Sequence, residues 1–205
     1  MARGSHLSRK AKLSQILNRT LSVLIEAATF VIVRHYSNGD FHMGRYDGMK
    51  GLVLGVANDH SIAWAIAKEL LAEGASIGFS HLPDRPDDQR QRNRRRVALL
   101  TDNEPNAKFL VPMDVSSDEQ IADVMKKTQE EFGTIDFLIH SIAYAPMDDL
   151  KGETTNCSRE GFRTAMETSA YSLLAVGRLS REILAKDASI LTLTYFGGEK
   201  VVPGY

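Results

Sequence analysis

Short apolar runs alternate with longer mixed segments along most of the chain. The runs, each followed by a turn or a polar stretch, predict five strands at 52–55, 75–80, 107–111, 135–140 and 188–194. The segments between them predict helices over 61–73, 87–100, 117–132 and 158–185. Strands that alternate with helices of about ten residues or more are typical of a parallel sheet covered on both faces. We therefore expect an α/β fold built on a doubly wound parallel sheet.

The first 42 residues differ from the remainder in pattern and in charge. Six apolar positions recur mainly at three- and four-residue steps, as a stripe along one helix requires: Leu13, Ile16, Leu17, Leu21, Leu24 and Ala28. The segment has six basic and two acidic side chains, a net charge of +4, whereas the remainder carries −5. Its apolar stretch of 13 residues, 21–33, is shorter than the ~20 needed to span a bilayer. We expect residues 1–42 to be a helical extension, accessory or non-native, with a membrane or targeting role as the less favoured alternative, and residues 43–205 to form the folded domain.

Composition excludes several classes of protein. Hydrophobic residues make up 43% of the 205 residues and charged residues 25%, which argues against wholesale disorder. A net charge of −1 argues against nucleic-acid binding by the chain as a whole. The single cysteine, Cys157, cannot form an internal disulfide and indicates a reducing compartment, so we expect a cytoplasmic protein. No histidine lies four positions from His81 or His140, and we expect no metal site.

The first predicted strand ends in a glycine-containing turn. Gly55 follows the strand, and Ser61 supplies a hydroxyl at the start of the next helix. In a doubly wound sheet this loop brings backbone N–H groups against a pyrophosphate, at the positive end of the helix. One glycine alone is a weak signal, because a purely structural turn would also explain it.

Four strings together are more specific than the glycine. They are GVANDHSIAWAIA from Gly55, MDVSSD from Met113, HSIAYAP from His140 and TYFGGEKVVPGY from Thr194. In this order, each at the carboxyl end of a predicted strand, they resemble the enoyl-acyl-carrier-protein reductases, a branch of the short-chain dehydrogenase/reductase superfamily with a Rossmann-like fold. The chain departs from the family's pattern at Ala65, where glycine is common; alanine is small enough to preserve the packing.

The resemblance implies a role for each matching residue. It places eleven residues at the active site: cofactor-binding Gly55, Ser61, Ile62, Asp114, Val115, Ser141, Ile142 and Ala143, substrate-contacting Ala145, and catalytic Tyr205, with Tyr195 as a second active-site tyrosine. Taken singly, Asp114 after an apolar strand would more often be a helix or turn cap, and Ser141 could be a hydrogen-bonded strand-end serine.

The implied reaction is reduction of a trans-2-enoyl thioester, carried by acyl carrier protein, during fatty acid elongation. The resemblance implies NADH as cofactor, with NADPH as the alternative, and a homo-tetramer for a full-length member. No acid directly follows the second strand, where Leu82 stands near a position that some relatives use toward the ribose. The arginines that follow are expected to form a solvated face: Arg90, Arg92, Arg94, Arg95 and Arg96.

Two other interpretations stay open. A ketoreductase of the same superfamily would place a serine about thirteen residues before the tyrosine, and Thr192 stands there, although HSIA does not match that group's segment after strand four. A non-catalytic dinucleotide-binding or interaction protein is the second. The resemblance also implies a lysine seven positions after Tyr205, where the sequence ends. We therefore expect the domain to be incomplete at its C-terminal part, and this chain to be marginally stable and inactive or nearly so.

Overall fold

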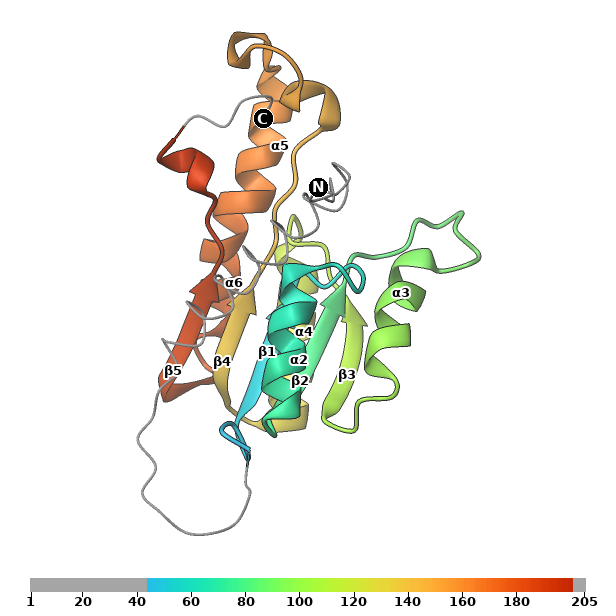
Figure 1. Ribbon diagram of the computed structural model, residues 1–205, viewed down its shortest axis with the longest axis vertical. Coiled ribbons are helices and arrows are strands. Elements are labelled where there is room, and N and C mark those ends of the chain that lie inside the picture. Colours follow the sequence, from blue (N-terminus) through green and yellow to red (C-terminus); the bar gives the residue numbers. More distant parts are fainter. Residues whose placement is uncertain (1–43, 201–205) are drawn as a thin grey trace, which may run out of the picture. The chain divides into compact units, whose positions relative to one another are not determined.

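Five parallel strands form one sheet in the computed structural model, which describes residues 44–200. The strands are β1 (Lys50–Leu54), β2 (Ser76–His81), β3 (Ala107–Pro112), β4 (Ile135–His140) and β5 (Leu184–Thr192). Their order across the sheet is β3-β2-β1-β4-β5, so all five carboxyl ends meet at one edge (Figure 1). The five strands and their parallel arrangement confirm the expected fold class.

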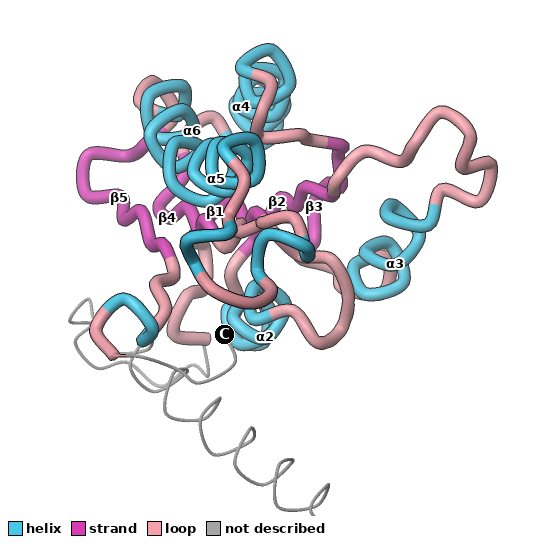
Figure 2. Tube along the Cα trace, turned by 90° about the horizontal axis from the view of Figure 1, so that it is seen from above, coloured by secondary structure: helices cyan, strands magenta, loops and turns pink. Residues whose placement is uncertain are grey.

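Helices cover both faces of this sheet. On one face lie α2 (Ile62–Ala72) and α3 (Arg92–Thr101), and on the other α4 (Asp118–Phe132) and α6 (Ser172–Ser180) (Figure 2). Helix α5 (Arg159–Met166) extends beyond the carboxyl ends of the strands (Figure 1). A π-helical turn, η3 (Glu167–Tyr171), joins α5 to α6. Three short 3₁₀ turns complete the described elements: η1 (Met147–Leu150), η2 (Thr154–Asn156) and η4 (Phe196–Gly198). The helices bury the central strands β1, β2 and β4, whereas the edge strands β3 and β5 stay partly exposed.

The last predicted helix and strand have wrong boundaries. The helix ends at Ser180 and not near residue 185, and β5 begins at Leu184 and not at residue 188. The N–H of Ile183 donates to the carbonyl of Ser180 at 3.0 Å, and the carbonyl of Ile183 accepts from the N–H of Ile135 at 2.8 Å. The chain therefore turns and joins β4 earlier, because Ile183 is buried in the core there.

The second helix also starts later than predicted, at Arg92 instead of residue 87. Two carboxylates preceding the helix accept its first N–H groups: Asp88 binds the N–H of Arg92 at 3.3 Å, and Asp84 binds that of Asn93 at 2.6 Å. Gln91, directly before the helix, has a left-handed backbone with φ 46°. Acceptors that satisfy the free N–H groups fix the first turn of the helix at this point.

The main hydrophobic core lies between the sheet and helices α4 and α6. Its central side chains are fully buried: Leu52, Leu54, Ile121, Ile135, Leu138 and Val176. On the opposite face, Trp64 of α2 packs against Phe79 of β2, with ring centroids 6.2 Å apart. The near-continuous apolar composition of β1 and β4 follows from burial on both faces of the sheet.

Several expectations concern residues outside the described range. Contacts divide the chain into two units, Met1–His42 and Met43–Tyr205, and every described residue belongs to the second. The helix expected within residues 1–42 and the catalytic role expected for Tyr205 both fall on undescribed residues and stay predictions. Among residues 44–200, no helix combines the length and apolarity that crossing a membrane requires.

Candidate functional site

The candidate site lies where the sheet changes direction of winding, between β1 and β4. Helix α2 follows β1 onto one face, whereas the chain after β4 reaches α6 on the other (Figure 2). Leu54 and His140 are partners in register at these strand ends, and the N–H of Ser141 donates to the carbonyl of Leu54 at 3.1 Å. In open α/β sheets, ligands bind in the crevice at this switch point.

Gly55 makes the close approach at the switch point possible. Its φ is +96°, a conformation that side chains with a Cβ rarely adopt. A Cβ at this position would overlap the backbone carbonyl of Ser141, and would also contact the side chain of Ile142 at 3.2 Å. The bare glycine therefore allows two site segments, from β1 and β4, to lie directly against each other.

The loop after Gly55 is organised by the hydroxyl of Ser61. Its Oγ accepts the N–H of Ala57 at 3.0 Å and the N–H of Asn58 at 3.1 Å, and does not cap α2. The N–H groups of Ile62 and Ala63 consequently have no hydrogen bond to another residue of the described range. Unbonded N–H groups at a helix start carry partial positive charge and suit an anionic ligand such as a phosphate.

The segment after β4 lies on the other side of Gly55. Ile142 packs against the main core, whereas Ala143 is exposed. Both backbone polar groups of Tyr144 bind one side chain: Ser169 Oγ accepts the Tyr144 N–H at 3.0 Å and donates to its carbonyl at 3.1 Å. The segment is thus pinned to the π-helical turn η3, which carries Ser169, and Ala145 follows it, half-buried.

His140, the last residue of β4, is buried beneath this segment with 1% of its surface exposed. Its Nε2 lies 2.9 Å from Ser172 Oγ, and its Nδ1 lies 3.4 Å from Thr192 Oγ1. Burial disfavours the imidazolium and lowers the pKa of His140 below its ordinary value of 6.5, and a backbone hydrogen bond partly opposes this. A neutral imidazole therefore connects β4, α6 and β5 at the floor of the site.

Folding stability is expected to fall with decreasing pH because of this histidine. A lowered pKa in the folded state means that the unfolded chain binds the proton more readily. The contribution of His140 is complete above the unfolded pKa of about 6.5, and is lost as pH falls from there to the folded pKa. Urea unfolding at several pH values should show this slope, and it should be reduced in His140→Gln. An identical slope in that variant would contradict the assignment.

The third strand ends in a turn closed by Asp114. One carboxylate oxygen accepts the N–H of Ser116 at 2.9 Å and its hydroxyl proton at 2.7 Å. The Asp114 N–H donates to Gln120 Oε1 at 2.9 Å, while Val115 is 7% exposed and belongs to the main core. The turn-capping interpretation of Asp114 is therefore confirmed. Its second carboxylate oxygen has no hydrogen bond within residues 44–200 and leaves an acceptor at the β3 end of the crevice.

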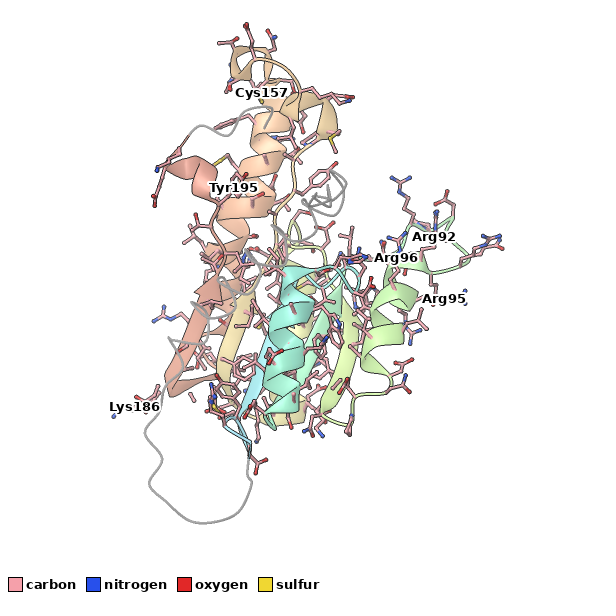
Figure 3. All side chains as sticks on the ribbon, viewed as in Figure 1. Arg92, Arg95, Arg96, Cys157, Lys186 and Tyr195 are labelled. Carbon is pink, nitrogen blue, oxygen red and sulfur yellow. The ribbon has the colours of Figure 1, made fainter. Side chains whose placement is uncertain are left out.

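Beyond β2 the charged groups are mostly engaged with one another or with solvent. Asp84 accepts N–H groups from the start of α3, and Arg92 pairs with Asp88 at 2.8 Å. All five arginines of the cluster are exposed, and Arg92, Arg95 and Arg96 project from α3 in Figure 3. The expectation of a solvated face is confirmed. Leu82, at 61% exposure, offers no hydrogen bond from its side chain to a ribose.

Tyr195 follows β5 with 52% of its surface exposed, and Figure 3 shows it well apart from the arginines of α3. Cys157 lies in the far loop before α5 and takes no part in the candidate site. The structure thus brings together the segments after β1 and β4, and places Asp114 two strands away, after β3.

Sequence reasoning missed the polar contacts made by the π-helical turn and by Ser172. One signal was available: Thr168 and Ser172 are four positions apart and so share one face of a helix otherwise packed on the sheet. A histidine at the end of an apolar strand needs partners of this kind when buried.

Strand order, parallel pairing and a glycine at the switch point define a Rossmann-like α/β domain. The family model described as enoyl-(acyl carrier protein) reductase matches residues 55–205. The chain therefore belongs to the enoyl-(acyl carrier protein) reductase family, a branch expected from its four sequence motifs.

Individual relatives agree with this assignment. The enoyl-[acyl-carrier-protein] reductase [NADH] of Nostoc sp. is 39% identical over 159 residues, which cover 77% of this chain and 59% of the relative. That of Aquifex aeolicus is 40% identical over 167 residues, covering 80% of this chain and 58% of the relative. The crystal structure of the Aquifex aeolicus enzyme has a TM-score of 0.70 at 39% identity and covers 77% of this chain and 60% of that one. The Anaplasma phagocytophilum reductase in complex with NAD has a TM-score of 0.70 at 35% identity, covering 82% and 60%. The chain spans about 60% of the length of the relatives it matches.

Proposed function

We propose that this protein reduces the carbon–carbon double bond of trans-2-enoyl thioesters carried by acyl carrier protein, using NADH. One observation carries the proposal: Gly55 and Ser141 meet at the switch point, beside a helix start with unbonded N–H groups. Family membership and the similarity to NADH-type enoyl-acyl-carrier-protein reductases support the choice of substrate and cofactor.

The residues present fit a dinucleotide. A Cβ at Gly55 would fill space next to the Ser141 backbone, and the N–H groups of Ile62 and Ala63 are available to a pyrophosphate. By their positions, two further sets would hold the ends of the cofactor: Asp114 and Val115 the adenine, and Ser141, Ile142 and Ala143 the nicotinamide. In this proposal Ser61 acts chiefly by shaping the loop, since its hydroxyl binds the N–H groups of Ala57 and Asn58.

When bound, the nicotinamide would supply hydride to the β carbon of the substrate. Negative charge would develop on the thioester oxygen, where a neutral donor stabilises the transition state, and the enolate would then take up a proton at the α carbon to complete the reduction. Tyr205 would donate this hydrogen bond, because a phenol donates while remaining un-ionised near neutral pH. Tyr195 would line the same pocket, and Ala145 would contact the acyl chain.

We expect NADH to bind more tightly than NADPH. The carboxylates of Asp84 and Asp88 lie just beyond β2, and Arg92 is already paired with Asp88. These carboxylates oppose a 2′-phosphate, although the crystal structure of the Bacillus cereus relative contains NADP+. Competition between the two reduced cofactors, followed by nicotinamide fluorescence, measures the preference. Tighter binding of NADPH would contradict this expectation and would indicate that the exposed arginines beyond β2 bind its 2′-phosphate.

Homo-oligomerisation is proposed from the outer surface of α5 and α6. Phe162 and Met166 are 62% and 48% exposed, and their four-residue spacing places them on one face of α5; Leu174 of α6 is 67% exposed. A second copy of the chain would bury this face. Cytoplasmic location is proposed on the basis of the single cysteine.

The choice among the candidate functions is made by product analysis. The purified chain and NADH are mixed at stoichiometric concentration with either a trans-2-enoyl or a 3-oxoacyl thioester, and the products are identified by mass spectrometry. Because this chain is expected to be inactive or nearly so in repeated turnover, the assay looks for a single turnover: we expect a small yield of the saturated thioester from the first substrate and no reduction of the second. Reduction of the oxo group would support the ketoreductase alternative, against which the hydrogen bond of Thr192 to His140 already argues. NADH binding with neither product would support a non-catalytic protein.

A further inference from the structure

Both ends of the segment Ser141–Ala143 are attached to one π-helical turn. Before the segment, His140 binds Ser172 Oγ, which in turn bonds the carbonyl of Thr168 at 2.6 Å. After the segment, Tyr144 binds Ser169 through both its backbone polar groups. Thr168 and Ser169 are consecutive residues of η3. A π-helical turn displaces the following residues relative to a regular α-helix, and such turns are frequent at functional sites.

The direction of each hydrogen bond follows from the available protons. The carbonyl of Thr168 can only accept, so the single hydroxyl proton of Ser172 is donated to it. Ser172 Oγ must then accept from His140, which places the imidazole proton on Nε2. Nδ1 has no proton in this tautomer and accepts from the hydroxyl of Thr192. The neutral imidazole therefore has both nitrogens satisfied in one tautomer only.

We propose that His140 and Ser172 are positioning residues for the segment Ser141–Ala143, and that they hold its backbone against Gly55. This inference rests on the proposed function, in which that segment faces the nicotinamide. Neither side chain touches the cofactor in this proposal. They act through the backbone, because His140 leads directly into Ser141 and its ring is tied to α6.

Few other contacts hold the segment 141–143, so the hydrogen bonds of His140 and Ser172 should affect its position and not only the stability of the core. Ser141 has one backbone bond, to Leu54, and Ile142 contributes apolar packing. Loss of the Ser172 hydroxyl would leave the Nε2–H of a buried ring without an acceptor. The ring must then tilt toward another acceptor or toward water, and the backbone that follows it moves as well.

The chain offers a matched pair of variants for the test. Ser172→Ala and Thr128→Val each remove a buried helical hydroxyl that bonds the carbonyl four residues earlier; the bond of Thr128 to Val124 is 2.7 Å long. Only Ser172 also accepts from a histidine. The measurements on the 205-residue chain are backbone amide resonances by NMR and the dissociation constant of NADH. We expect Ser172→Ala to shift the amides of 141–144 and to raise the constant about tenfold, with neither effect in Thr128→Val.

His140→Gln and His140→Leu provide an independent comparison. Glutamine keeps an N–H donor that reaches toward Ser172, whereas leucine keeps none. We expect NADH affinity in the glutamine variant to lie closer to that of the unmodified chain. Equal affinity loss in both, or amide shifts in Ser172→Ala no larger than in Thr128→Val, would overturn the positioning role. Failure of the unmodified chain to bind NADH would overturn the proposed function instead, and the amide shifts would still decide whether these residues fix the segment.

Discussion

Gly55→Ala is expected to lower the free energy of unfolding by about 2–5 kcal/mol and to remove measurable NADH binding. Two costs add at this position. The φ of +96° strains any residue that has a Cβ, and the added carbon overlaps the carbonyl group of Ser141. Because the overlapping atoms are backbone, the neighbouring segment must move away. Urea unfolding and nicotinamide fluorescence measure the two effects.

Gly133→Ala is the matched control for this variant. Gly133 also has a positive φ, +72°, but no atom lies within 4 Å of the Cβ that would be added. It therefore carries the backbone strain without the overlap, and a loss of about 1 kcal/mol is expected, with unchanged NADH affinity. Equal effects of the two substitutions would show that close packing against Ser141 has no part in the site.

Much of the fold was predictable because its signals are local. The third predicted helix matches α4 closely, since Ser117 caps its first turn through Gln120 N–H at 3.3 Å and Gly133 ends it. Residues 135–140 form β4 as predicted, because a mostly apolar run of this length, with Asp136 as its one partly exposed residue, suits a strand buried on both faces. In both elements the signals lie within the segment or directly beside it, so no distant residue is needed to predict them.

The region around α6 and β5 was less predictable because distant residues decide it. Val176, Leu179 and Ile183 keep a helical spacing through the polar residues 180–182, and only pairing with Ile135 shows where the chain leaves the helix. The π-helical turn likewise has no glycine or proline to mark it. Ser169 within the turn binds Tyr144, 25 positions away, and Ser172 directly after the turn binds His140, 32 positions away.

The sequence predicted which segments form the candidate site, but not the hydrogen bonds that their side chains make. The order of four motifs locates the segments after β1, β3, β4 and β5, because carboxyl ends of parallel strands share one edge. The role of each hydroxyl depends on geometry. Ser61 binds its own loop and leaves α2 uncapped, and Asp114 closes a turn with one of its oxygens. Residue type and spacing alone do not distinguish these arrangements.

Glycines within the strands also have a role that appears only across the sheet. Gly51 of β1 is in register with Phe137 of β4, and Gly78 of β2 with Phe109 of β3. In each pair the phenylalanine ring occupies the space where a Cβ of the glycine would lie. A glycine in a strand interior weakens the strand unless a neighbour packs over it. The two pairs therefore act as matched cross-strand units of the core.

Phe137→Ala is expected to cost about 3–5 kcal/mol of unfolding free energy, because a ring with 1% exposure leaves a cavity. Gly51→Ala alone is expected to cost about 1–3 kcal/mol, since the new methyl group overlaps that ring. In the double variant the methyl enters space that the ring has left, so the combined loss should be smaller than the sum by at least about 1 kcal/mol. Urea unfolding of all four proteins measures this coupling.

A second cycle shows whether the coupling is specific to the pair. Gly78→Ala introduces the same methyl group on β2, but there it meets the ring of Phe109 and not that of Phe137. Combined with Phe137→Ala, its effect should be additive within about 0.5 kcal/mol. Coupling of equal size in both cycles would mean that the sheet relaxes as a whole, and the glycine–phenylalanine pairs would lose their separate role. Coupling in the first cycle only would show that each glycine is matched to the ring beside it.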